Sequence, residues 1–124
     1  MELILGGAFQ GKLTYASEKY GLSGEALCDL GTVLPDAGTK CVYHLEAFTK
    51  KAAKKGLTAL EALELLMPVS RFCAVVSREI GNGIVPMAAF EREWRELHGA
   101  VLKELALRAE RVTRIFCGIP EVLK

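Results

Sequence analysis

The sequence feature that most constrains this chain is a glycine-rich stretch near its N-terminus. An apolar run at residues 3–5 leads into Gly6-Gly7-Ala8-Phe9-Gln10-Gly11-Lys12, and a helix-compatible run at residues 12–18 follows it. The spacing Gly-x-x-x-x-Gly-Lys between a strand and a helix is the phosphate-binding P-loop pattern. Its glycines let backbone N–H groups turn toward an anion, and its lysine brings a positive charge to the outer phosphates. The pattern favours phosphate or nucleotide binding; the alternative is a strand–helix turn that binds nothing.

The residue after this lysine departs from the pattern. A P-loop has Ser or Thr there, whose hydroxyl holds Mg²⁺, whereas this chain has Leu13. Thr14 lies one position later, about 100° further around the helix, and is a poor substitute. We expect nucleotide binding to survive this change and metal-dependent phosphoryl transfer to be weakened. The predicted nucleotide-binding residues are Gly6, Gly7, Ala8, Phe9, Gln10, Gly11, Lys12, Leu13 and Thr14.

Length and composition indicate a single domain spanning residues 1–124. The 124 residues are 51% hydrophobic and 25% charged, so a packed core can form. A net charge of +1 argues against a nucleic-acid-binding surface. The apolar runs are too short for a membrane span and no signal peptide is recognisable, so we expect a cytoplasmic protein. The four cysteines are widely spaced without a Cys-x-x-Cys pair, which favours buried apolar roles over a zinc or redox site.

Hydrophobic periodicity predicts an alternation of strands and helices. We expect strands at residues 2–5, 41–44, 72–77 and 112–117, the last ended by 118–120, and helices at 12–20, 45–55, 58–67 and 87–110. Residues 26–30 form either a short strand or a turn of helix. The continuous apolar run at 72–77 is typical of a parallel strand buried on both faces. This order predicts an α/β fold, a P-loop NTPase-like (RecA-like) parallel sheet with helices on both faces.

Such sheets bind their ligands at the carboxyl ends of the strands, where three segments of this chain are expected to meet. They are the glycine-rich stretch, residues 44–46 and residues 78–86. Glu79 follows the most apolar strand and either holds Mg²⁺, directly or through water, or caps a loop or helix. Arg78 either pairs with Glu79 or contacts phosphate. Lys12 and Glu79 are the predicted catalytic residues, and Glu79 is the predicted metal ligand.

Four further residues are assigned from their positions in these elements. His44 or Glu46 would take the Walker-B-like, metal-holding position if the strand at 41–44 lies beside the strand of the glycine-rich stretch. Because Mg²⁺ prefers oxygen ligands, a structural role is favoured for His44, and Glu46 is by default a carboxylate on the helix surface. Trp94 recurs at helical spacing and is predicted to lie in the core, whereas His98 is predicted at the surface or an interface.

Two separated stretches of the chain resemble one family, the bifunctional adenosylcobinamide kinase/adenosylcobinamide-phosphate guanylyltransferases of cobalamin synthesis. Residues 4–16 are similar to the family's start: an apolar strand, Gly-Gly-Ala, two residues, Gly-Lys-Ser, then an aromatic residue and Ala. Residues 75–86, which end in Gly81-Asn82-Gly83-Ile84-Val85-Pro86, resemble the family's strand ending in Asn-Glu-Val-Gly-x-Gly-Ile-Val-Pro. Trp94-Arg95-Glu96 and Gly99 match its aromatic-Arg-Asp…Gly pattern.

This resemblance implies a protein that binds ATP or GTP through residues 6–14, with Mg²⁺ as the metal. It also implies a corrinoid substrate, a cobinamide whose aminopropanol hydroxyl is phosphorylated, and assembly as a homo-oligomer. The chain departs from the family at Leu13, at Leu102 where the family has Asn, and at His44 where the family has an acidic residue. Its middle is shorter, and the missing part includes the region of the family's guanylylated histidine. The shorter middle favours a kinase-like protein over a guanylyltransferase. Leu13 favours the alternative, a catalytically impaired nucleotide-binding or assembly protein that keeps the kinase scaffold, whereas Lys12 and Glu79 favour the kinase-like protein.

Overall fold

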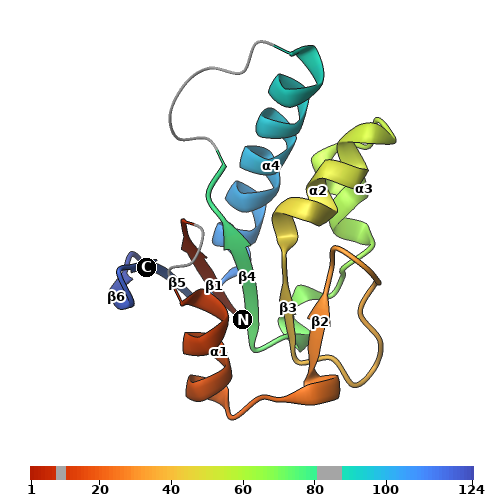
Figure 1. Ribbon diagram of the computed structural model, residues 1–124. Coiled ribbons are helices and arrows are strands. Elements are labelled where there is room, and N and C mark those ends of the chain that lie inside the picture. The colour runs from red at the N-terminus through yellow and green to blue at the C-terminus, as the bar shows by residue number, and fades with distance from the viewer. Residues whose placement is uncertain (8–10, 81–87) are drawn as a thin grey trace.

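The computed structural model describes residues 1–7, 11–80 and 88–124, which fold around a six-stranded sheet (Figure 1). The strands are β1 (Glu2–Gly6), β2 (Leu27–Asp29), β3 (Cys41–Tyr43), β4 (Ala74–Arg78), β5 (Arg111–Phe116) and β6 (Ile119–Val122). Their order across the sheet is β2-β3-β4-β1-β5-β6. The first five strands are parallel to one another, and β6 runs antiparallel to β5. The α-helices of the described residues are α1 (Lys12–Tyr20), α2 (Leu45–Lys54), α3 (Ala59–Glu64) and α4 (Ala89–Arg108).

The central strands are apolar on both sides because helices cover both faces of the sheet. Successive residues of a strand point to opposite faces. Leu3 and Val75 therefore pack in the core formed with α2, α3 and α4, whereas their neighbours Ile4 and Val76 pack in the core on the α1 side. Figure 1 shows α1 on one face and the other three helices on the opposite face. The predicted α/β, P-loop NTPase-like sheet with helices on both faces is confirmed.

β3 does not lie beside β1, as His44 or Glu46 would need in order to take the Walker-B-like position. β4 pairs with β1 on one side and with β3 on the other, so one strand separates β3 from the strand of the glycine-rich stretch. Neither His44 nor Glu46 therefore follows a strand adjacent to β1. Both still follow β3 at the carboxyl edge of the sheet, because β3 and β4 are parallel.

The chain end also differs from the expectation, because residues 118–120 do not end the sheet. β5 turns back through Cys117 and Gly118, whose φ angles are 51° and 75°, into β6. Two consecutive residues with positive φ make the tight turn that suits a hairpin, and Pro120 is tolerated because β6 is an edge strand. Cys117 is exposed in this turn, so the prediction of a buried cysteine is wrong there.

The structure also gives the bounds of two further elements, β2 and α4. Residues 26–30, which the sequence left open, contain β2, preceded by a 3₁₀ turn at Gly24–Ala26. The helix expected at 87–110 corresponds to α4, and Met87 lies outside the described residues. None of the helices within the described parts of the chain has the length and apolarity needed to cross a membrane.

A polar cluster anchors the opposite, amino-terminal edge of the sheet to α1. Glu2 is only 2% exposed, and its carboxylate accepts hydrogen bonds from Lys19 Nζ (2.8 Å), from Tyr20 Oη (2.6 Å) and from the Thr113 hydroxyl. Burial raises the pKa of Glu2, but these donors outweigh burial and leave the pKa below its ordinary value. Burial and the same carboxylate raise the pKa of Tyr20 to about 12. The ionised Glu2 therefore joins β1, β5 and α1.

Replacing this carboxylate should destabilise the fold in a pH-dependent way. We expect Glu2→Gln to lower the free energy of unfolding by about 2 kcal/mol at pH 7, because charge-assisted hydrogen bonds are lost. The folded-state pKa lies below the unfolded value of 4.5, so this stabilisation is complete above pH 4.5 and is lost as the pH falls through the folded pKa. Urea unfolding at pH 7 and pH 3.5 would measure both effects.

Glu18→Gln is the matched control, since Glu18 is exposed on α1, the helix to which Glu2 is hydrogen-bonded. An equal loss of stability in the two variants, or a Glu2→Gln loss independent of pH, would contradict the role given to Glu2.

Candidate functional site

The amino end of α1 is the first part of the site. Gly11 precedes the helix with φ 82° and ψ 22°, a left-handed conformation that glycine adopts without strain. Gly6, at the end of β1, passes so close to β5 that a Cβ atom would lie 2.6 Å from the Ile115 carbonyl oxygen. Both glycines of the predicted pattern are thus required by the backbone. The predicted residues Ala8, Phe9 and Gln10 lie outside the described residues.

Lys12 is the first residue of α1, and its side chain turns back over the glycine-rich stretch. Its Nζ donates a hydrogen bond of 2.6 Å to the Gly7 carbonyl oxygen. Partial burial lowers the pKa of Lys12, while attraction to the carboxylate of Glu46 opposes this effect. The ammonium group therefore lies at the start of a helix, where backbone N–H groups also attract anions.

A cavity of about 430 Å³ opens beside this lysine. Three segments of the chain line it at the carboxyl edge of the sheet: the start of α1, the end of β3 with the first turn of α2, and the end of β4. The lining residues are Gly11, Lys12, Leu13, Thr14, Tyr43, His44, Glu46, Ala47, Val76 and Arg78. A volume of this size is typical of small-ligand sites, which run from roughly 300 to 1,000 Å³. The structure thus brings the predicted residues 11–14 together with residues that follow β3 and β4.

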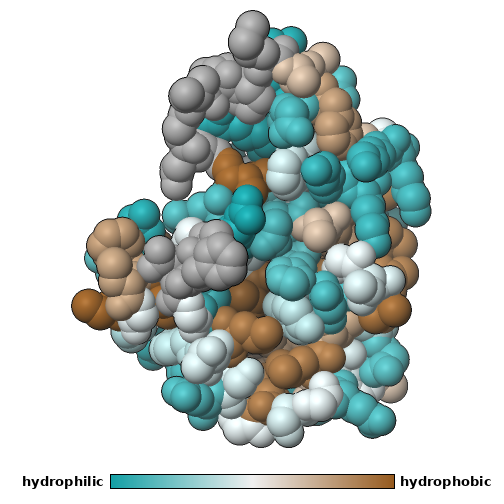
Figure 2. Space-filling view, in the orientation of Figure 1, coloured by the Kyte–Doolittle hydropathy of each residue, from teal (hydrophilic) through white to brown (hydrophobic). Residues whose placement is uncertain are grey.

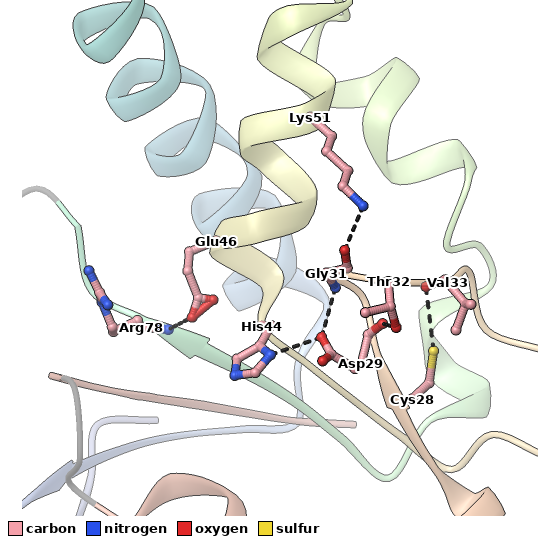
Figure 3. Close-up of polar contacts among 9 residues, drawn as sticks. All are labelled: Cys28, Asp29, Gly31, Thr32, Val33, His44, Glu46, Lys51 and Arg78. Atoms are coloured by element: carbon pink, nitrogen blue, oxygen red, sulfur yellow. Dashed lines mark hydrogen bonds and ion pairs between the residues drawn. The ribbon is translucent and has the colours of Figure 1, made fainter.

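Glu46 and Arg78 form the wall opposite α1. The backbone N–H of Arg78 donates to Glu46 Oε1 at 3.1 Å (Figure 3). The second carboxylate oxygen, Oε2, is buried and has no hydrogen-bond partner among the described residues. The default prediction that Glu46 is a carboxylate on the helix surface is therefore wrong, since α2 begins at this edge and its first turn faces the cavity.

His44 and Asp29 form a polar pair on the same side of the cavity. His44 precedes α2 in a left-handed conformation, φ 59° and ψ 42°, and its Nδ1 lies 2.8 Å from Asp29 Oδ1. Burial raises the pKa of Asp29, but His44 and the Gly31 N–H outweigh burial and hold it below its ordinary value. Sequence reasoning missed Asp29. Its place beside His44 depends on the pairing of β2 with β3, which puts Asp29 in register with Tyr43, the residue before His44.

Glu79 points away from this cavity. Its carboxylate lies 3.5 Å from Arg114 Nε on β5, and it lines a separate cavity together with Arg95 and His98. Adjacent strand residues face opposite sides, which is why Arg78 lines the Lys12 cavity and Glu79 does not. Glu79 still contributes an attraction that raises the Lys12 pKa, although a smaller one than Glu46. Its assignment as a metal ligand stays a prediction.

The two residues after the lysine differ in their surroundings. Leu13 lines the cavity and also packs against the apolar cluster on the α1 face of the sheet. Thr14 is exposed. The cavity therefore presents an apolar side chain where a P-loop pattern has a hydroxyl.

A buried histidine supports the floor of the site from behind. His98 on α4 is 1% exposed, so the prediction of a surface histidine is wrong. Its Nε2 lies 3.2 Å from the Arg78 carbonyl oxygen, and its Nδ1 lies 2.8 Å from Thr49 Oγ1. A carbonyl only accepts, so the network assigns the proton to Nε2 and lets Nδ1 accept from Thr49. Burial lowers the pKa of His98, and the Arg78 carbonyl and Glu46 oppose this in part.

Trp94 completes this network and is half-buried rather than part of the closed core. Its indole N–H donates to the Glu46 carbonyl oxygen (3.1 Å) and to Thr49 Oγ1 (3.0 Å). Together, Trp94 and His98 tie α4 to the first turn of α2 and to the end of β4. The two elements that carry Glu46 and Arg78 are thereby held in one arrangement.

A comparison with the sequence models of known families identifies the family of this chain. The sequence model of the cobinamide kinase / cobinamide phosphate guanyltransferase family matches residues 31–123, which is 93 of the 124 residues. The chain belongs to this family. The match confirms the resemblance predicted from the sequence, and it spans β3, β4, α4 and β5 while beginning after the glycine-rich stretch.

The family's enzymes act in cobalamin biosynthesis with cobinamide and nucleotide substrates. No curated protein matches the chain. The family assignment therefore depends on residues 31–123. Residues 6–14 lie outside the match, so it does not bear on their predicted nucleotide binding.

The His98 network predicts a specific pH dependence of stability. We expect His98→Ala to lower the free energy of unfolding at pH 7.5 by about 3 kcal/mol, because buried partners lose their hydrogen bonds. Native His98 has a pKa below the unfolded value of 6.5, so the unfolded chain takes up the proton first. The wild type therefore loses stability as the pH falls below 6.5, by at most about 1.4 kcal/mol per pH unit from this group.

Since the variant lacks this contribution, its stability deficit should shrink between pH 7.5 and pH 5.5 in denaturant unfolding. His44→Ala, which removes the exposed histidine, is the matched control and should show no such narrowing. A His98→Ala deficit that stays constant over this range would contradict the buried neutral histidine.

Proposed function

We propose that this chain binds ATP or GTP with the phosphates beside Lys12 and transfers the terminal phosphoryl group to the aminopropanol hydroxyl of a cobinamide. The observation that carries the proposal is the cavity at the start of α1, where Lys12 and Arg78 face one space at the carboxyl edge of the sheet. Membership of the cobinamide kinase / cobinamide phosphate guanyltransferase family supplies the substrate class. We do not propose guanylyl transfer. The middle of this chain is shorter than in the family it resembles, and the missing part includes the region of the family's guanylylated histidine.

Charge supports phosphate binding at this position. Lys12 provides an ammonium group, and α1 provides the backbone N–H groups of its first turn and the positive end of its dipole. The contact between Lys12 Nζ and the Gly7 carbonyl holds the lysine over the glycine-rich stretch, and a phosphate oxygen is a stronger acceptor for the same ammonium. Phosphoryl transfer depends mainly on such positioning and charge neutralisation.

The donor set of the cavity also fits a magnesium ion. Mg²⁺ prefers oxygen ligands, and Glu46 offers a buried oxygen without a hydrogen-bond partner among the described residues. Glu79 is the carboxylate predicted from the sequence, but it lies beside Arg114 and lines a separate cavity. When bound, the ion would neutralise phosphate charge. Leu13 offers no hydroxyl to it, so we expect weaker metal dependence than in a P-loop with Ser or Thr.

A catalytically impaired nucleotide-binding or assembly protein is the alternative, and two observations favour it. Leu13 removes a metal-binding group. The β5–β6 hairpin also leaves large apolar side chains exposed, which appear as brown atoms at the left of Figure 2. These are Phe116, Ile119, Val122 and Leu123. Exposed apolar surface on an edge strand is typical of contact surfaces, and it supports the prediction of a homo-oligomer.

Nucleotide binding and turnover should be measured separately. We expect calorimetry to show that Mg-ATP or Mg-GTP binds. Lys12→Ala should weaken this affinity at least tenfold, because Lys12 is the only lysine among the described residues that line the cavity. Lys103→Ala, at an exposed position on α4, is the matched control. Mass spectrometry should then detect phosphorylated cobinamide after incubation with Mg-nucleotide.

Binding without product would favour the alternative function. Absence of binding in the wild type, or equal affinities of Lys12→Ala and Lys103→Ala, would contradict both functions. Leu13→Ser restores the hydroxyl and should tighten Mg-nucleotide binding; an unchanged affinity would contradict the proposed position of the metal.

A further inference from the structure

The pair formed by His44 and Asp29 has the arrangement of an oriented proton acceptor. Asp29 Oδ1 lies 2.8 Å from His44 Nδ1, and an ionised carboxylate can only accept a hydrogen bond. Nδ1 therefore carries the ring proton, and Nε2 holds the lone pair of the neutral imidazole. The hydrogen bonds that keep the Asp29 pKa below its ordinary value support the ionised state. The two residues come from the ends of adjacent strands, β2 and β3.

The surroundings fix both partners of this pair. The Gly31 N–H donates to the same Asp29 oxygen at 2.8 Å, and Lys51 Nζ donates to the Gly31 carbonyl at 2.6 Å (Figure 3). The loop after β2 is thus tied to α2. The His44 ring packs edge-on to Tyr43, with ring centroids 4.7 Å apart, and its side chain remains 56% exposed. The imidazole is held in orientation and is still accessible to a substrate.

His44 lines the same cavity as Lys12, so it faces the space assigned to the phosphates. The charged and titratable groups around it are Asp29 and Lys51 behind it, Tyr43 beside it, and Lys12, Glu46 and Arg78 across the cavity. Within the described parts of the chain, Asp29 is the residue that hydrogen-bonds the imidazole ring.

We propose that His44 is the general base of the phosphoryl transfer and that Asp29 is its positioning residue; the inference rests on the proposed kinase function. As the acceptor oxygen attacks the terminal phosphorus, its proton moves to His44 Nε2. A bond forms between the acceptor oxygen and phosphorus, and the bond from phosphorus to the bridging oxygen breaks, releasing ADP or GDP. The imidazolium, paired with Asp29, then returns the proton to solvent. Proton transfer of this kind contributes about 10²- to 10⁴-fold to a rate.

The sequence makes this proposal open to a direct chemical probe, because the chain has two histidines. Diethylpyrocarbonate reacts with a histidine nitrogen that carries an accessible lone pair. His98 is buried and both of its ring nitrogens have partners, whereas His44 is exposed. In the folded protein we expect rapid modification at His44 alone, slowed at least fivefold by saturating Mg-ATP or Mg-GTP.

Asp29→Asn should slow the modification, because a neutral amide oxygen is a weaker acceptor for the Nδ1–H than a carboxylate and leaves Nε2 less nucleophilic. Asp36→Asn is the matched control, since Asp36 accepts from the Gly38 N–H in the same way that Asp29 accepts from Gly31, without a histidine partner. Modification of His44 that neither nucleotide nor Asp29→Asn changes would overturn the proposal.

Turnover tests the catalytic role. We expect His44→Gln to keep nucleotide affinity within twofold and to reduce kcat for cobinamide phosphorylation at least 100-fold. Asp29→Asn should reduce kcat less than His44→Gln does, and Asp36→Asn should match the wild type. Unchanged turnover in His44→Gln would overturn this inference alone. A wild type that binds nucleotide without forming product would overturn the kinase function and the inference together.

The intact mass of the protein after incubation with Mg-GTP distinguishes a proton acceptor at His44 from a nucleophile. A stable nucleotidyl adduct on His44 would show that the imidazole attacks phosphorus itself, which contradicts the role of proton acceptor. An unmodified mass is the expected result.

Discussion

The site depends on the burial of β1 between β4 and β5. This strand has parallel neighbours on both sides and apolar residues on both faces, so its carboxyl end is fixed against the rest of the sheet. Gly6 ends the strand where a Cβ atom would meet the Ile115 carbonyl, and α1 begins after Gly11. At the other end, buried Glu2 joins β1 to α1 and β5. Lys12 therefore has a defined position relative to the ends of β3 and β4.

The opposite wall of the cavity is fixed by hydrogen bonds rather than by apolar packing. His98 binds the Arg78 carbonyl and Thr49, and Trp94 binds Thr49 and the Glu46 carbonyl. On the outer side, Asp29, Gly31 and Lys51 hold the loop after β2 to α2. These two networks set the positions of Glu46, Arg78 and His44 around one space. A preorganised arrangement of charges suits phosphoryl transfer, because little reorganisation is then needed during the reaction.

Sequence reasoning predicted the parts of this account that depend on local pattern. The apolar run before Gly6, the helix after Lys12 and the apolar strand before Arg78 were found because each has its own periodicity or spacing. Roles that depend on distant partners were missed. Asp29 meets His44 only through the pairing of β2 with β3, His98 is buried only because Thr49 and the Arg78 carbonyl can bind it, and Glu79 turns toward Arg114 on β5.

The central claim is that nucleotide phosphates occupy the cavity beside Lys12. A titration of ¹⁵N-labelled protein with Mg-ATP or Mg-GTP, followed by backbone amide chemical shifts, tests this claim most directly. If nucleotide occupies this cavity, the largest shift changes should fall at residues 11–14, 43–47 and 76–78, the three segments that surround it. Changes confined to other surfaces, such as the groove between Leu34 and Leu57, or no change at millimolar nucleotide, would contradict it.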